Sequence, residues 1–209
     1  MADPSFPKRD PADPEFWELR YGAHFAPWDA GKVPVQLLAF VRSSPPRRVL
    51  VPGCGSAWDV RCFAEHGWDV TGIDFSAAAV REARNVLGSY RDRVREADFF
   101  APIVEAPFAM VYERALLCAL PRRMWGDWAR REAQLIPAEG LLAGFFYFDA
   151  GDRGPPFPLH SQAELDDLLA PSFERVADEP VPDSIDVFRG KERWQVWRRQ
   201  SGGAPNSSD

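Results

Sequence analysis

The sequence predicts an α/β fold with a doubly wound, mostly parallel sheet of seven strands, helices on both faces and an antiparallel last strand. Short apolar runs alternate along the chain with segments of helical period, which is typical of this class. The first apolar run, Val49 to Val51, leads through Gly53 and Gly55 into a helical segment. The second run ends about 20 residues later in Asp74, a spacing typical of a strand, a turn, a helix and a strand.

The first 45 residues are expected to form a tail and a helical cover. Residues 1–12 are rich in Pro, Asp and Ala and are predicted to be disordered. Asp13 followed by Pro14 has the pattern of an N-cap and a first helical position, so a short helix should begin there and end at Gly22. Residues 33–42 have apolar side chains at helical spacing, and two serines and two prolines end that helix.

Caps and apolar runs predict the later elements of one domain over residues 13–200, followed by a disordered tail at 201–209. Ser76 is expected to cap one helix, and Ser161 with Glu164 forms a capping box for another. The last two strands should pair like a hairpin. The expected strands are 48–51, 68–73, 94–97, 108–112, 141–148, 173–177 and 193–198, and the expected helices after residue 45 are 57–66, 76–87, 124–135 and 161–169.

Composition argues against several classes of protein. The net charge of −6, the isoelectric point near 5.2 and the absence of a basic block argue against nucleic acid as a partner. No apolar run approaches the roughly 18 residues of a membrane span. The three cysteines form no C-x-x-C and the three histidines have no ligand spacing with them, so we expect no disulfide framework and no metal site. We therefore expect a cytoplasmic monomer whose partner is a small molecule.

The turn after the first strand and the end of the second strand predict a nucleoside-containing cofactor. Gly53 and Gly55 have no Cβ, so their backbone can approach a ligand closely. Asp74 is placed to accept hydrogen bonds from the two hydroxyls of a ribose, and Phe75 and Ser76 continue the same strand end.

Two cofactor classes compete for this site. A nicotinamide site prefers a third small residue, and here Trp58 stands in its place. Asp98, Phe99 and Phe100 follow the next strand, where a carboxylate can accept from an adenine amine while an aromatic ring stacks on the base. This pattern favours S-adenosylmethionine. A nicotinamide-dependent oxidoreductase and a noncatalytic cofactor-binding protein remain as alternatives.

Four segments in order along the chain form a combined pattern. They are Trp17 with Pro27-Trp28-Asp29-x-Gly31, residues 49–55, residues 113–121 and residues 154–157. Together they resemble the thiopurine S-methyltransferase family, including its halide and thiol methyltransferase branch, over about residues 16–198. One departure is that Val51 and Ala57 stand where methyltransferases in general often have an acid and a glycine, although the family shares the first of these.

The resemblance implies a Rossmann-like methyltransferase that converts S-adenosylmethionine to S-adenosylhomocysteine. It implies that residues 13–45 form a lid, with Trp17 and Trp28 beside the sulfonium and methyl end of the cofactor. Glu113 would belong to the cofactor site, and Arg114 would hold the acceptor. The expected acceptor is the sulfur of a thiol or thiopurine-like compound, with a halide or thiocyanate as the alternative.

Overall fold

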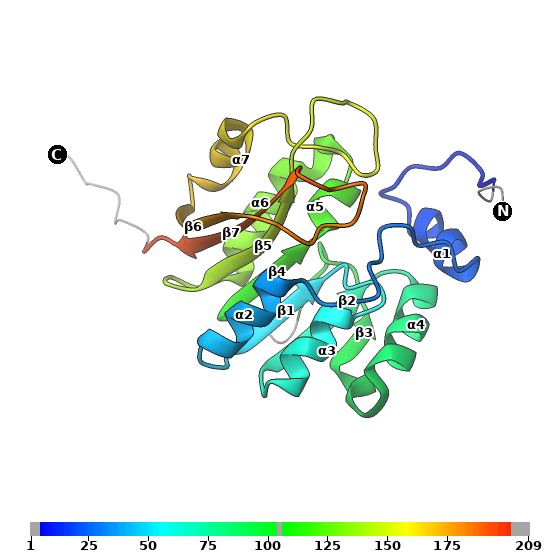
Figure 1. Ribbon diagram of the computed structural model, residues 1–209, viewed down its shortest axis with the longest axis horizontal. Helices are drawn as coiled ribbons and strands as arrows, with labels where there is room; N and C mark the ends of the chain where they lie inside the picture. Colours follow the sequence, from blue (N-terminus) through cyan, green and yellow to red (C-terminus); the bar gives the residue numbers. More distant parts are fainter. Residues whose placement is uncertain (1–4, 104–105, 202–209) are drawn as a thin grey trace.

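The computed structural model describes residues 5–103 and 106–201 and contains a seven-stranded sheet between two helical layers (Figure 1). The strand order is β3-β2-β1-β4-β5-β7-β6. The strands from β3 to β5 pair in parallel, and β7 runs antiparallel to both β5 and β6. The predicted fold class is therefore confirmed. The strands are β1 Arg48–Pro52, β2 Asp69–Asp74, β3 Val94–Glu96, β4 Met110–Arg114, β5 Leu141–Tyr147, β6 Phe173–Pro180 and β7 Glu192–Arg199.

Each face of the sheet is buried under its own set of helices. Val49 and Val51 of β1 belong to one core cluster, and Leu50 between them belongs to the other. A strand buried on both faces needs a continuous apolar run, which is what β1 has. The first layer is formed by α2 Val35–Ser43, α3 Trp58–Glu65 and α4 Ala77–Leu87, and the second by α5 Leu116–Ala119, α6 Trp125–Leu135 and α7 Gln162–Leu169.

Helix α1 (Pro14–Gly22) lies outside these layers, beside α4 at the edge of the molecule (Figure 1). Asp13 caps it as expected, because its side chain accepts from the backbone N–H of Glu15. In contrast, Leu37 and Val41 of α2 are fully or almost fully buried in the first core cluster. The second half of the predicted lid, residues 35–43, therefore packs as a core helix.

Several helix boundaries differ from the expected ones for local reasons. Helix α2 starts at Val35 rather than at residue 33, because Pro34 is its N-cap in an extended conformation. The expected helix over 124–135 begins at Trp125, after a 3-10 turn at Arg122–Met124. The short helix α5 was not expected, since four residues give no periodic signal.

None of the described helices is long and apolar enough to cross a membrane. Within residues 5–103 and 106–201 no group of three potential metal ligands comes together. Cys54, Cys62 and Cys118 are all free thiols.

Gly144 of β5 permits the close contact between β4 and β5 at the edge of the site. It lies opposite Glu113 of β4, and a Cβ at this position would be 1.9 Å from the Glu113 carbonyl oxygen. We expect Gly144→Ala to lower the free energy of unfolding by about 3 kcal/mol, because the two strands would have to separate. Urea denaturation measures this.

Gly126→Ala is the matched control for that measurement. A Cβ on Gly126 of α6 would meet only Arg130 at an ordinary 3.6 Å, so we expect a gain of about 0.5 kcal/mol from helix propensity. Equal effects of the two substitutions would contradict the importance of the contact at Gly144.

Candidate active site

The turn between β1 and α3 has a left-handed backbone at three positions. Gly53, Gly55 and Ala57 have φ angles of +59°, +50° and +63°. A Cβ on Gly55 would lie 2.4 Å from the hydroxyl oxygen of Tyr21, and one on Gly53 would lie 3.1 Å from Leu116. Glycine is therefore required at Gly55 both for its conformation and for space.

Asp74 lies at the carboxyl end of β2, directly against this turn. Its Oδ2 accepts from the Gly55 N–H at 3.0 Å, and its Oδ1 accepts from the Ser76 N–H at 2.9 Å. Burial raises the pKa of this carboxyl to about 6, although the two backbone hydrogen bonds oppose the shift. The strand end thus presents a buried carboxylate bonded to the backbone of the glycine turn.

A cavity of about 850 Å³ lies at this edge of the sheet. A volume in this range is typical of small-molecule and cofactor sites. The structure brings together at this cavity all the residues predicted for the site except Ser76 and Glu113. Those lining it are Trp17, Trp28, Gly53, Gly55, Asp74, Phe75, Asp98, Phe99, Phe100 and Arg114.

The N-terminal segment supplies an aromatic wall of the cavity. Trp28 packs edge-on against Trp17 and Tyr21, with ring centroids 5.3 and 5.9 Å apart. The Trp28 indole N–H also donates to the Tyr21 hydroxyl at 3.2 Å. Tyr21 also lines the cavity but was not among the predicted site residues. Its position four residues after Trp17, on the same face of a helix, was the signal available.

Asp98, Phe99 and Phe100 form a compact corner after β3. The Asp98 Oδ1 accepts from the Phe100 N–H at 2.9 Å, and the two phenylalanine rings pack edge-on with centroids 5.2 Å apart. All three residues line the cavity. The corner thus presents a carboxylate beside aromatic rings, as expected.

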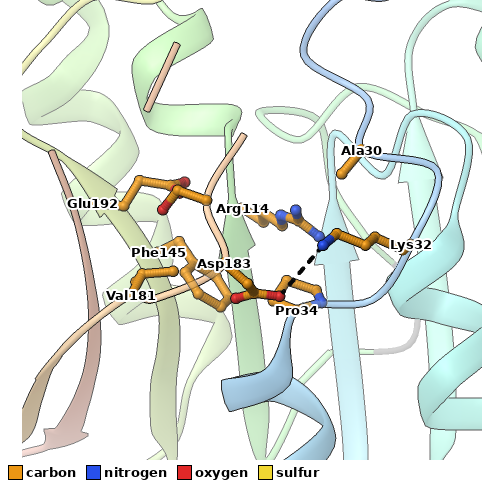
Figure 2. A pocket seen from close by; sticks show the side chains of 9 residues that line it. Ala30, Lys32, Pro34, Arg114, Phe145, Val181, Asp183 and Glu192 are labelled. Carbon is orange, nitrogen blue, oxygen red and sulfur yellow. Dashed lines mark ion pairs between the residues drawn. The ribbon is translucent and has the colours of Figure 1, made fainter. Parts of the chain in front are cut away.

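Arg114 lines the cavity at the end of β4, but its guanidinium is already paired. Its Nη1 lies 3.1 Å from both carboxylate oxygens of Asp59, which also accepts from the Tyr112 hydroxyl at 3.2 Å. A smaller cavity of about 10 Å³, enough for about one water molecule, lies beside Arg114 (Figure 2). Figure 2 also shows Lys32 pointing toward Asp183, and the ion pair between these two residues measures 3.9 Å.

Glu113 lies outside the cavity, contrary to the prediction that it belongs to the cofactor site. It is 1% exposed, and its Oε1 accepts from the Leu117 N–H at 2.9 Å. Because side chains alternate along a strand, Glu113 and Arg114 point to opposite sides of β4. Ser76 is also buried away from the cavity, where it caps α4 by accepting from the Ala79 N–H. Both residues therefore stabilise the backbone next to the site and do not line the cavity themselves.

Glu113 and Glu132 of α6 are two buried carboxyls in this region. Neither oxygen of Glu132 has a hydrogen-bond partner among the described residues. Burial raises the pKa of Glu113 to about 7, and burial together with the charge of Glu113 raises the pKa of Glu132 well above its ordinary value. The folded protein therefore binds protons that the unfolded chain has already lost.

This excess of bound protons predicts that stability falls as the pH rises from about 5 to 8. In Glu132→Gln the side chain cannot ionise, so we expect the free energy of unfolding of this variant to fall less steeply over that range than that of the parent. Urea denaturation at each pH measures the difference. Glu174→Gln on β6, at an exposed carboxyl, should follow the parent curve. Parallel curves for Glu132→Gln and the parent would contradict the assignment of buried protons.

Comparisons with known proteins show similarity to methyltransferases in sequence and in fold. The family model described as thiopurine S-methyltransferase matches residues 12–200. The chain is 31% identical over 191 residues to thiocyanate methyltransferase 1 of Brassica oleracea, covering 88% of this chain and 84% of that protein. It is 32% identical over 178 residues to thiopurine S-methyltransferase of Vibrio cholerae, covering 75% and 81%.

Among solved structures, a similar fold occurs in the 1,6-didemethyltoxoflavin-N1-methyltransferase of Burkholderia thailandensis with bound S-adenosylhomocysteine. The TM-score is 0.74 at 18% identity, with 95% of this chain and 94% of that chain covered. A second similar fold is the N-methyltransferase NodS of Bradyrhizobium japonicum in complex with S-adenosylhomocysteine, with a TM-score of 0.66, 16% identity and coverage of 79% and 85%.

Proposed function

The chain belongs to the thiopurine S-methyltransferase family and is an S-adenosylmethionine-dependent methyltransferase acting on sulfur, and we propose that its acceptor is a small thiol or thiopurine-like compound bound beside Arg114. The observation behind this proposal is a cavity that joins Asp74 and the glycine turn at one end to Arg114 at the other. Because the chain belongs to this family, a methyltransferase is favoured over the two alternatives left open by the sequence, a nicotinamide-dependent oxidoreductase and a noncatalytic cofactor-binding protein.

The residues present fit S-adenosylmethionine, since Gly53, Gly55 and the buried Asp74 carboxylate all line a cavity of cofactor size. We assign Asp74 to the ribose hydroxyls and Asp98, with its neighbouring aromatic rings, to the adenine. Phe75, Phe99 and Phe100 are the aromatic residues at this end, and Gly53 and Gly55 offer backbone contact.

Trp17 and Trp28, with Tyr21 between them, are assigned to the sulfonium end. When bound, the cofactor supplies a methyl group on positively charged sulfur. A cation beside the face of a Trp ring gains about 0.5–2 kcal/mol, so these rings favour the charged form over the neutral product.

Arg114 is assigned to the acceptor. Because Asp59 balances its charge, Arg114 offers N–H donors with little net positive field. This favours a sulfur attached to polar ring atoms over a bare halide. Phe188 and Cys118 are buried apolar residues that also line the cavity, and such a lining would remove water from a thiolate. Thiolates are strong nucleophiles, so positioning and desolvation supply much of the acceleration.

A halide or thiocyanate acceptor is the second candidate, because several relatives are named thiocyanate methyltransferases. The cytoplasmic location, the monomeric state, the absence of nucleic-acid and membrane partners, and the disordered ends at 1–12 and 201–209 stay predictions. Of these ends, residues 1–4 and 202–209 lie outside the described residues, and residues 5–12 make defined contacts, such as the Pro11 carbonyl accepting from the Trp17 indole.

We expect Asp74→Ala to weaken binding of S-adenosylhomocysteine by about 10-fold or more, the effect of losing hydrogen bonds to a charged acceptor. Calorimetry measures this, and Asp69→Ala at the exposed start of β2 is the control. In the parent protein, affinity should be full above pH 6 and fall below it, because protonation of Asp74 removes an acceptor. Unchanged affinity in Asp74→Ala, or tight binding of NAD, would refute the assignment.

We expect Arg114→Leu to lower kcat/KM for aryl thiols and thiopurines by about 10-fold or more, the effect of one lost charged hydrogen bond. Affinity for S-adenosylhomocysteine should hardly change. Steady-state assays with thiols, thiopurines, iodide and thiocyanate provide the comparison, and Arg123→Leu on the exposed surface is a control. If thiol turnover survives in Arg114→Leu and iodide is the better substrate, the halide alternative replaces this one.

A further inference from the structure

Glu18 of α1 joins the N-terminal segment to the start of α4. Its Oε2 accepts from the Ser76 hydroxyl at 2.7 Å and from the Ala78 N–H at 2.8 Å. Its Oε1 pairs with Arg81 at 3.4 Å. All three partners belong to the cap and the first turns of one helix, so a single carboxylate fastens α1 to α4.

The charge of Glu18 suits its position. The N-terminus of a helix has free N–H groups and a partial positive charge, which favour a carboxylate there. Burial by itself would raise the pKa of Glu18, but the hydrogen bonds from Ala78 and Ser76 and the charge of Arg81 lower it. The side chain is therefore ionised at neutral pH, and charge-assisted hydrogen bonds of this kind are stronger than neutral ones.

The residues at this attachment point are also bonded or adjacent to residues that line the cofactor site. Ser76, which donates its hydroxyl to Glu18, also donates its backbone N–H to Asp74 at 2.9 Å. On the other side, Trp17 precedes Glu18 in α1 and Tyr21 follows one turn later, and both line the cavity. Glu18 itself does not line the cavity, so it acts through these neighbours.

We propose that Glu18 is a positioning residue that holds α1 against α4, so that Trp17 and Tyr21 stay over the cofactor and retard its release. The inference concerns the cofactor end of the site and does not depend on the identity of the acceptor. Without the Glu18 carboxylate, α1 keeps its own cap at Asp13 and its helix, but it loses the bonds by which it is fastened to α4. Cofactor and product then leave sooner.

The test compares Glu18→Ala and Glu18→Gln with Glu15→Ala in the full chain. Glu15 lies on the same helix and pairs with Arg9 instead of α4, so it is the matched control. Stopped-flow tryptophan fluorescence gives the dissociation rate of S-adenosylhomocysteine, hydrogen exchange of residues 14–22 reports the attachment of α1, and thermal unfolding reports the fold.

For Glu18→Ala we expect product dissociation about 10-fold faster, the effect of losing charged hydrogen bonds. The KM for S-adenosylmethionine should rise about as much, while the acceptor KM and the melting temperature stay as in the parent. The dissociation rate and the KM of Glu18→Gln should lie between those of the parent and of Glu18→Ala, because the amide oxygen of Gln still accepts a hydrogen bond from the Ala78 N–H. With cofactor bound, hydrogen exchange in residues 14–22 should be faster in Glu18→Ala than in the parent.

Dissociation unchanged in Glu18→Ala would overturn the proposal. A drop in melting temperature with equal losses in both KM values would also overturn it, since it would indicate a purely structural role. If Asp74→Ala still weakens binding in the same assays, the assignment of the cofactor site stands even when this inference fails.

Discussion

The left-handed turn after β1 is the constraint on which the site depends. The Cys54 N–H donates to the Ile73 carbonyl at 3.0 Å, and the Gly55 N–H donates to Asp74, so the turn is bonded to the end of β2. Parallel pairing of β1 with β2 brings those two strand ends together. A side chain at Gly55 would occupy the place of the Tyr21 hydroxyl. The turn therefore sets the position of both the carboxylate and the aromatic wall.

The site is then enclosed by segments that are distant in sequence. The N-terminal segment is attached near one end through Glu18 to α4. Near its other end the Gln36 amide donates to the carbonyl of Pro180, the last residue of β6, and the Val35 N–H donates to Asp183 in the segment between β6 and β7. Between these two attachments lie the aromatic residues that line the cavity. The cover of the site thus depends on contacts with α4 and with the edge of the sheet, together with the ring contacts within the segment itself.

Prediction from local sequence signals selected residues that lie together at the cavity. Asp74, Asp98 and the two glycines of the turn follow apolar runs, and parallel strands bring such ends to one edge of a sheet. It failed at Glu113, where the prediction took two neighbouring residues of a strand into one site although successive side chains face opposite sides. It also missed Tyr21, Asp59 and Phe188, since nothing near Asp59 or Phe188 in the sequence distinguishes them from core or surface residues.

The sequence by itself determined the strand and helix order, the parallel sheet, the glycine turn with its acid, and the family. These follow from periodicity, caps and short motifs, which act over a few residues. Only the tertiary structure decided the partners of the charged side chains. Arg114 is paired with Asp59, Glu113 is buried opposite α6, and Glu18 lies at the N-terminus of α4. Such pairings join residues 55 to 60 positions apart, or depend on which face of a strand is covered, and no local pattern encodes them.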